Sequence, residues 1–251
     1  MGVAFTCSVD DGYPSDVKMA ALLHKHGLNA TFFVPVRNSE GFDVVSPAQL
    51  REIARHFEIG SHTFEHCYLN LLDPVQARYQ VNEGKNRLED MLGTAIAGFC
   101  YPGGKHRQRD IETVKQAGFK YARTVTNLRF DAGDKPFEMP TTVQFYPHDS
   151  RVFYRNFASC GDWMKRHEGL RVAIQYRYWI DRLYALFDHA CEHGSAFHLW
   201  GHSKEIDDLR AWRELDRFLA YVARNIAMPD RLNNEQLAAR CYVTCDEQLA
   251  A

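Results

Sequence analysis

The first half of the chain alternates short apolar runs, rich in β-branched and aromatic residues, with amphipathic stretches of helical length. The runs at 2–9, 31–34, 57–60, 96–101 and 120–125 predict strands. The stretches at 15–25, 46–56, 73–93 and 107–116 predict helices. Strands that alternate with helices in this way are typical of a parallel sheet with helical crossover connections.

Two of these helices carry clear signals at their first residues. Ser46-Pro47-Ala48-Gln49 combines a capping box with a proline at the first helical position. Asp73-Pro74 opens the next helix in a similar way. The boundary residues therefore support the elements that the apolar pattern predicts.

The second half is less regular. From 127 to about 169 the pattern weakens and prolines interrupt it, so we expect a long irregular insertion there. The pattern then predicts a helix at 176–193, a strand at 195–200, a helix at 207–225 and a last strand at 241–243. The sequence shows no internal repeat or low-complexity linker. We therefore predict one domain over 1–251, with an α/β fold in which roughly seven parallel strands form a distorted or incomplete (β/α) barrel.

The composition excludes several classes of protein. The chain has 251 residues, of which 45% are hydrophobic and 25% charged, as in ordinary soluble globular proteins. A net charge of −2 and the lack of a basic run argue against a nucleic-acid partner. The longest apolar stretch, at 30–36, is too short to span a membrane.

The amino terminus lacks the pattern of a secretory signal, so we expect a cytoplasmic location. Nothing in the sequence indicates an oligomeric state.

The seven cysteines are odd in number and scattered along the chain, so they do not form a disulfide framework. We expect them to be reduced thiols.

The first predicted strand ends in Ser8-Val9-Asp10-Asp11-Gly12, where parallel α/β folds build their active sites. Adjacent side chains diverge at a strand end, so one carboxylate can bind a metal while its neighbour reaches the substrate or a water molecule. Asp-Gly is also a common turn pair, so this motif alone leaves both interpretations open.

His62-Thr63-Phe64-Glu65-His66 follows the third predicted strand and places two histidines four residues apart. On a helical turn this spacing directs both imidazoles to one point. Two unrelated surface histidines are the alternative. Together with Asp11, however, the pair makes a three-ligand set with an open position, which is typical of catalytic zinc.

Two further strand ends carry candidate residues. Tyr101-Pro102-Gly103-Gly104 is either a plain strand-to-helix turn or one whose backbone amides donate to a developing oxyanion. In the late strand, His198, Trp200 and His202 share one face. His202 stands at the carboxyl end, toward the expected site, whereas His198 lies deeper and is a candidate to support the site by a hydrogen bond.

This set of motifs resembles the polysaccharide deacetylase family, the carbohydrate esterases with the chitooligosaccharide deacetylase homology domain. Ser8-Val9-Asp10-Asp11-Gly12 is similar to the Thr-Phe-Asp-Asp-Gly motif of that family. Asn29-Ala30-Thr31-Phe32-Phe33-Val34 is similar to its second strand, and the histidine pair matches its His-Ser/Thr-x-x-His motif. The resemblance covers about 2–126 and returns at 194–206, so the chain resembles a divergent member.

The resemblance implies roles for these residues. Asp11, His62 and His66 would bind one divalent metal ion, most often zinc. The metal would polarise the amide carbonyl and lower the pKa of the attacking water, whose proton Asp10 would accept as the general base. His202 would protonate the leaving amine, with His198 as the reserve candidate. The residues expected to bind the substrate or the oxyanion are Gly103, Tyr101, Trp200 and Arg123.

The sequence also departs from the family pattern. Cys100 stands where the family carries an arginine that orients the catalytic aspartate, and a thiol cannot make that ion pair. Arg123, at the end of the fifth predicted strand, is either its substitute or a surface residue. The partner of His202 is also open, because Asp162-Trp163 matches the family's fourth motif by residue type alone and Glu205 lies beside His202.

The sequence thus predicts a metal-dependent hydrolase of carbon–nitrogen amide bonds other than peptide bonds. Its expected substrate is an N-acetylated sugar or glycan intermediate, in cell-surface polysaccharide assembly, or another small amide. One alternative is an amidohydrolase of small ureide or purine-type molecules. The other is a catalytically weakened member that binds a glycan or a partner, which the loss of the motif arginine favours and the presence of a general base disfavours.

Overall fold

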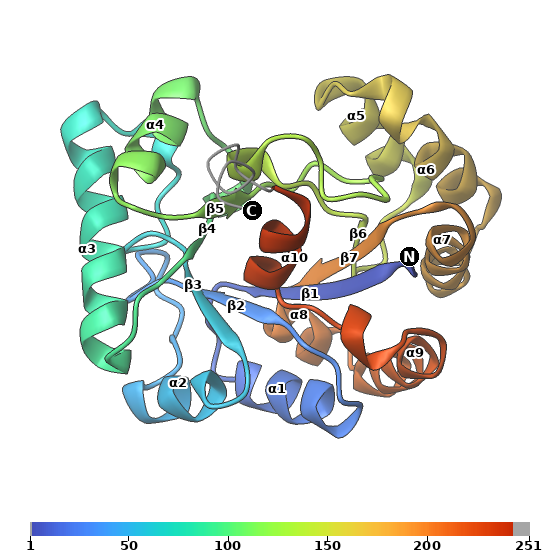
Figure 1. The fold of residues 1–251 in the computed structure, drawn as a ribbon, viewed down its shortest axis with the longest axis horizontal. Coiled ribbons are helices and arrows are strands. Elements are labelled where there is room, and N and C mark those ends of the chain that lie inside the picture. The colour runs from blue at the N-terminus through green and yellow to red at the C-terminus, as the bar shows by residue number, and fades with distance from the viewer. Residues whose placement is uncertain (1, 243–251) are drawn as a thin grey trace, which may run out of the picture.

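The structure is a computed structural model that describes residues 2–242. Its parallel strands form a single curved sheet in the order β5-β4-β3-β2-β1-β7-β6 (Figure 1). The strands are β1 (Ala4–Asp10), β2 (Thr31–Val34), β3 (Glu58–Ser61), β4 (Gly98–Cys100), β5 (Tyr121–Arg123), β6 (Val143–Gln144) and β7 (Ala196–Gly201). This arrangement confirms the predicted distorted (β/α) barrel, which opens between β5 and β6.

Helices surround the curved sheet (Figure 1). They are α1 (Asp16–Lys25), α2 (Pro47–Ala54), α3 (Pro74–Leu92), α4 (Gln108–Gln116), α5 (Ser150–Ser159), α6 (Trp163–Gln175), α7 (Trp179–His193), α8 (Ser203–Asp208), α9 (Trp212–Asn225) and α10 (Asn234–Cys241). Four short 3₁₀ helices are η1 (Leu69–Leu71), η2 (Pro102–Gly104), η3 (Pro136–Glu138) and η4 (Met228–Asp230). Within 2–242, none of the helices has the length and apolarity needed to cross a membrane.

Two predicted helix starts are confirmed at the level of hydrogen bonds. At α2 the Ser46 side chain accepts from the backbone N–H of Gln49, and the Gln49 side chain accepts from that of Ser46. At α3 the Asp73 carboxylate accepts from the first free N–H groups of the helix. These bonds satisfy donors that have no partner inside the helix, and for that reason the two motifs were readable from sequence.

The two faces of β1 have different surroundings. Phe5, Cys7 and Val9 belong to the main hydrophobic core, which includes residues of the outer helices. Thr6 Oγ1 donates to Asn234 Oδ1 at 2.7 Å, and Asn234 Nδ2 donates to Ser8 Oγ at 3.0 Å. The inner face of β1 is therefore polar, and α10 supplies part of its hydrogen-bonding partners.

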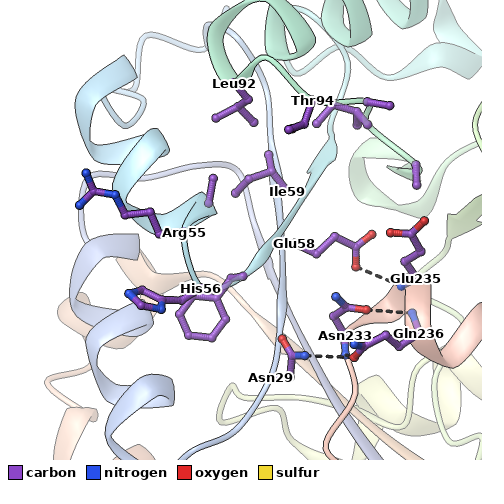
Figure 2. Close-up of a pocket in the computed structure, with 15 residues that line it drawn as sticks. Asn29, Arg55, His56, Glu58, Ile59, Leu92, Thr94, Asn233, Glu235 and Gln236 are labelled. Atoms are coloured by element: carbon purple, nitrogen blue, oxygen red, sulfur yellow. Dashed lines mark hydrogen bonds between the residues drawn. The ribbon is translucent and has the colours of Figure 1, made fainter.

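A pocket of about 410 Å³ lies at the amino-terminal ends of β2, β3 and β4 (Figure 2). Helix α10 borders it, where the Glu235 N–H donates to Glu58 Oε2 at 3.0 Å and Asn29 Nδ2 donates to Gln236 Oε1 at 3.0 Å. The candidate catalytic residues are at the other, carboxyl, ends of the strands. These bonds therefore hold α10 against the sheet at the end opposite to the site.

The segment 127–169 is more regular than the sequence predicts. It contains β6, α5 and the first part of α6. Arg166 is fully buried and donates to the backbone carbonyls of Asn127, Asn156, Phe157 and Gly161. These tertiary hydrogen bonds organise the segment, and an apolar pattern does not reveal them.

Two late elements also differ from expectation. The single helix predicted at 207–225 is divided into α8 and α9, because Arg210 between them has a left-handed φ of 54°. The strand predicted at 241–243 is wrong for Cys241, which is the last residue of α10. Val243 lies outside the described residues.

Gly84 lets α3 approach the histidine motif closely. A Cβ at this position would lie 2.8 Å from the carbonyl carbon of Thr63 and 2.9 Å from the backbone nitrogen of Phe64. The Phe64 N–H donates to the carbonyl of Gln80 on the same helix at 2.9 Å. The backbone between His62 and His66 thus rests directly on α3.

We expect Gly84→Ala to lower the free energy of unfolding by about 1–3 kcal/mol, as overpacking does, although alanine is the better helix former. Urea denaturation measures this change. Asn86→Ala, at an exposed position of the same helix, is the control and should be neutral or stabilising. Equal effects of the two substitutions would contradict the close approach.

Candidate active site

The site begins with two neighbouring carboxylates at the end of β1. Asp10 is 2% exposed and Asp11 is 7% exposed, so both are withdrawn from water. Asp10 is the last strand residue, and Asp11 and Gly12 then adopt left-handed φ angles of 75° and 66°. This sharp turn lets the two carboxylates take different partners.

Asp11 faces both histidines of the predicted pair. Its Oδ1 lies 3.3 Å from His62 Nε2 and 3.1 Å from His66 Nε2. The two imidazole centroids are 5.1 Å apart. The structure therefore brings the three predicted ligands together.

The local backbone around the histidines is not the helical turn that the spacing predicts. Thr63 and His66 have left-handed φ angles of 65° and 59°, and the segment after β3 forms irregular turns. The His62 N–H donates to the Val34 carbonyl at 3.2 Å, which fixes the start of the turn. The imidazoles converge because of this turn, not because of helical periodicity.

These three side chains fit a metal ion. Their ligand atoms all lie within 4.8 Å of one another, and all three residues are buried. His62 Nδ1 donates to the backbone carbonyl of Cys100 at 2.8 Å, which leaves Nε2 toward Asp11. Metal-binding histidines are commonly oriented by such a bond. Two imidazole nitrogens and one carboxylate are a donor set that suits zinc.

The ionisation of Asp11 agrees with this interpretation. Burial alone would raise the pKa of Asp11, but the neighbouring imidazoles of His62, His66 and His202 lower it well below its usual range. Asp11 is therefore a carboxylate at neutral pH, as a metal ligand must be.

A second group of possible ligands lies beside the first. The ligand atoms of Asp10, His62 and Cys100 also lie within 4.8 Å of one another. However, burial raises the pKa of the Cys100 thiol far above its usual value, and the Arg123 guanidinium already pairs with Asp10. The Asp11 group is the better metal site, because a second imidazole takes the place of the protonated thiol and no guanidinium pairs with its carboxylate.

His202 follows β7 and faces Asp11 from the other side. Its Nε2 lies 3.7 Å from Asp11 Oδ2, and its Nδ1 lies 2.8 Å from Glu205 Oε2. Burial alone would lower the pKa of His202, but the bond to Glu205 and the charges of Asp11 and Asp10 raise it to about 9. His202 is therefore protonated at neutral pH and can donate a proton.

Residues 4–122 match the family model described as polysaccharide deacetylase. Over this segment the chain is similar to the polysaccharide deacetylase family. YxkH of Bacillus subtilis, which is named after the same family, is 27% identical over 117 residues, or 46% of this chain and 42% of YxkH. The chain spans less than half the length of the curated relatives that it matches.

Solved structures share the fold over nearly the whole chain. A Mycobacterium smegmatis protein named after the family has a TM-score of 0.65 at 18% identity, covering 96% of this chain and 91% of that one. The Xyl-CE4 domain of a multidomain xylanase from the hindgut metagenome of Trinervitermes trinervoides has a TM-score of 0.56 at 12% identity, covering 96% and 93%. At these identities, the likeness establishes the common fold.

The arginine that the family pattern places at Cys100 is supplied here by the neighbouring strand. Cys100 on β4 and Arg123 on β5 are register partners, and Arg123 is fully buried. Its Nη2 donates to Asp10 Oδ1, and its guanidinium lies over the rings of Phe33 and Trp200, 5.3 Å and 5.2 Å from their centroids. Arg123 is thus an interior residue that orients Asp10, and the alternative of a surface arginine is excluded.

Of the two other candidates on β7, Trp200 lies beside His202 and His198 lies deeper in the sheet. The Trp200 ring lies 5.5 Å from that of His202, and its buried Nε1–H has no hydrogen-bond partner within the described part of the chain. His198 Nε2 lies 2.5 Å from Ser8 Oγ, deeper in the sheet. Burial and Arg123 lower the pKa of His198 well below its usual value. His198 is therefore neutral and supports the core, and His202 is the better proton donor.

Gly103 and Tyr101 have different environments. Gly103 has a φ of 57°, and a Cβ there would lie 2.5 Å from Tyr68 Cε1, so the turn requires glycine. The Tyr101 side chain is fully buried; its hydroxyl donates to the Phe137 carbonyl at 3.2 Å, and its ring stacks on His106. The Tyr101 side chain therefore points into the packing around η3, and a contact of Tyr101 with the oxyanion or substrate through its backbone stays a prediction.

The partner of His202 is Glu205, one turn into α8. Asp162 instead accepts from Arg129 at 2.7 Å, and Trp163 is 59% exposed and donates to the Phe157 carbonyl. Asp162 and Trp163 are thus bonded to other residues than His202. Sequence reasoning also missed Glu40, whose Oε1 lies 3.4 Å from His66 Nδ1, and no motif signals it.

The Asp10–Arg123 pair is testable by a double-mutant cycle. Removing one partner of a buried ion pair costs about 3–5 kcal/mol, because the other charge stays buried without compensation. We expect Arg123→Met to lower the free energy of unfolding by this amount, and the double variant Asp10→Asn/Arg123→Met to lose much less than the sum of the single changes. Urea denaturation of the four proteins measures the coupling. Additive losses would contradict the pairing.

Proposed function

We propose that this protein is a metal-dependent deacetylase of N-acetylated sugars or glycan intermediates. The observation that carries the proposal is the position of Asp11 within 3.3 Å of two imidazole nitrogens, with His202 and Asp10 beside it. Asp11, His62 and His66 would hold one divalent metal ion, for which zinc is the expected identity. Such an ion would act as a Lewis acid that polarises the amide carbonyl and lowers the pKa of a nearby water molecule.

Asp10 is the proposed general base. Arg123 fixes its orientation through Oδ1 from the neighbouring strand. The carboxylate accepts a proton from the attacking water while the water oxygen forms a bond to the carbonyl carbon. The adjacent position of Asp10 and Asp11 on β1 puts the base next to the metal ligands without placing it among them.

His202 is the proposed general acid. Its Nδ1 is held by Glu205, so Nε2 faces the site. The carbon–nitrogen bond breaks as the leaving nitrogen gains the Nε2 proton, and the products are acetate and a free amine. The Gly103 N–H is the proposed donor to the carbonyl oxygen, and Trp200 is proposed to line the substrate pocket.

A pure binding role is the main competing function. Binding a glycan requires neither a buried base nor a protonated histidine opposite it. The pKa of His202, raised to about 9 by Glu205 and the aspartates against the effect of burial, supports catalysis over binding. A small-molecule amidohydrolase would use the same groups, and the substrate panel below separates it from a sugar deacetylase.

We expect about one zinc ion per chain in protein purified without chelator, and its loss in His62→Ala, since one imidazole ligand is removed. Elemental analysis measures the metal, and acetate release from a panel of N-acetylated sugars measures activity. His167→Ala, at an exposed histidine on α6, is the matched control and should retain both. Wild-type protein without metal would contradict the proposed centre, and metal without acetate release would contradict the sugar deacetylase.

Asp10→Asn separates catalysis from binding. General base catalysis contributes about 10²–10⁴-fold to rate, so we expect acetate release to fall by that factor while the zinc content stays unchanged. The same two assays measure both quantities. A normal rate in this variant would exclude Asp10 as the base.

A further inference from the structure

The bond between His202 and Glu205 is one part of a longer chain of hydrogen bonds. Glu205 Oε2 lies 2.8 Å from His202 Nδ1 and also accepts from Gln144 Nε2 at 2.9 Å. Gln144 Oε1 lies 2.8 Å from His148 Nε2. This series of hydrogen bonds thus runs from the candidate acid through α8 to β6 and to the loop that follows β6.

The direction of each bond follows from the chemistry of the groups. A carboxylate only accepts, so His202 Nδ1–H and the Gln144 amide N–H₂ both donate to Glu205. The amide oxygen of Gln144 must then face His148, which donates from Nε2–H. Burial lowers the pKa of His148, so its ring is neutral at neutral pH and offers a single N–H. Donors and acceptors therefore match at every hydrogen bond of this series.

Gln144 and His148 are both held by bonds to neighbouring elements. Gln144 pairs with Trp200 in the β6–β7 ladder, and the next residue, Phe145, donates its N–H to the Trp200 carbonyl at 2.8 Å. The His148 carbonyl accepts from Nη1 of Arg182 at 2.6 Å, and Arg182 is 2% exposed. Glu205 is held less closely by its own element, because its side chain is 32% exposed on the short helix α8.

We propose that Gln144 is a positioning residue for His202, and that His148 holds Gln144 in place. The two bonds to the same oxygen of Glu205 fix that carboxylate, which in turn holds the imidazole with Nε2 toward Asp11. The proposal rests on the proposed function, in which His202 is the acid. Gln144 and His148 both lie after the segment 4–122 that matches the family model. Residues outside the matched segment therefore set the orientation of the acid.

Steady-state kinetics on the zinc-loaded enzyme test the proposal. We expect Gln144→Leu to lower kcat about 10- to 100-fold, as removal of supporting hydrogen bonds behind metal ligands does, with little change in KM. His148→Ala should lower kcat as well, and His148→Gln, which keeps an N–H donor, should restore most of it. Gln108→Leu is the matched control, because Gln108 donates to Glu112 at the surface of α4, and its kcat should be unchanged. A wild-type kcat in Gln144→Leu would overturn the proposal.

Proton–nitrogen NMR of the histidine rings provides a readout that does not depend on turnover. We expect the Nδ1–H signal of His202 in zinc-loaded wild-type protein and in His148→Gln, and its loss by solvent exchange in Gln144→Leu. An unchanged signal in Gln144→Leu would overturn the positioning role. If the wild-type enzyme releases no acetate, the proposed function fails, but the loss of this signal in Gln144→Leu would still support the role of Gln144.

Discussion

Two adjacent carboxylates are buried at the end of one strand, and the arrangement of the site follows from the need to compensate both. Uncompensated buried charges cost several kcal/mol each, so Asp10 and Asp11 require separate partners. Arg123 on β5 compensates Asp10, and the imidazoles of His62 and His66, with a metal ion as proposed, compensate Asp11. The left-handed turn at Asp11 makes this separation possible.

The parallel sheet places these partners where they are needed. β1 lies between β2 and β7, so residues that follow β3 and β7 reach Asp11 from opposite sides. Arg123 lies on β5, two strands beyond β3 in the sheet. Its guanidinium lies over the ring of Phe33 and reaches Asp10 from there. Cys100 stands where the family pattern has an arginine, and its register partner on the next strand, Arg123, carries a guanidinium that pairs with Asp10.

The sequence predicts much of this arrangement. The strand ends, the Asp10-Asp11 pair and the spacing of His62 and His66 are local features, and parallel strands bring their carboxyl ends to one edge. The backbone of the histidine turn was not predictable, because left-handed φ values at Thr63 and His66 have no residue signature. The direction of the Tyr101 side chain and the order in 127–169 depend on tertiary contacts, such as those of Arg166, that a linear pattern does not contain.

The proposed centre requires that Asp11 holds the metal while Asp10 stays paired with Arg123. X-ray diffraction from crystals of the zinc-loaded protein, with anomalous data at the zinc edge, shows both groups at once. We expect one strong anomalous peak bounded by Asp11 and the Nε2 atoms of His62 and His66, with the Asp10–Arg123 pair intact. A peak bounded by Asp10, His62 and Cys100, with Arg123 displaced, would contradict this division of the two aspartates.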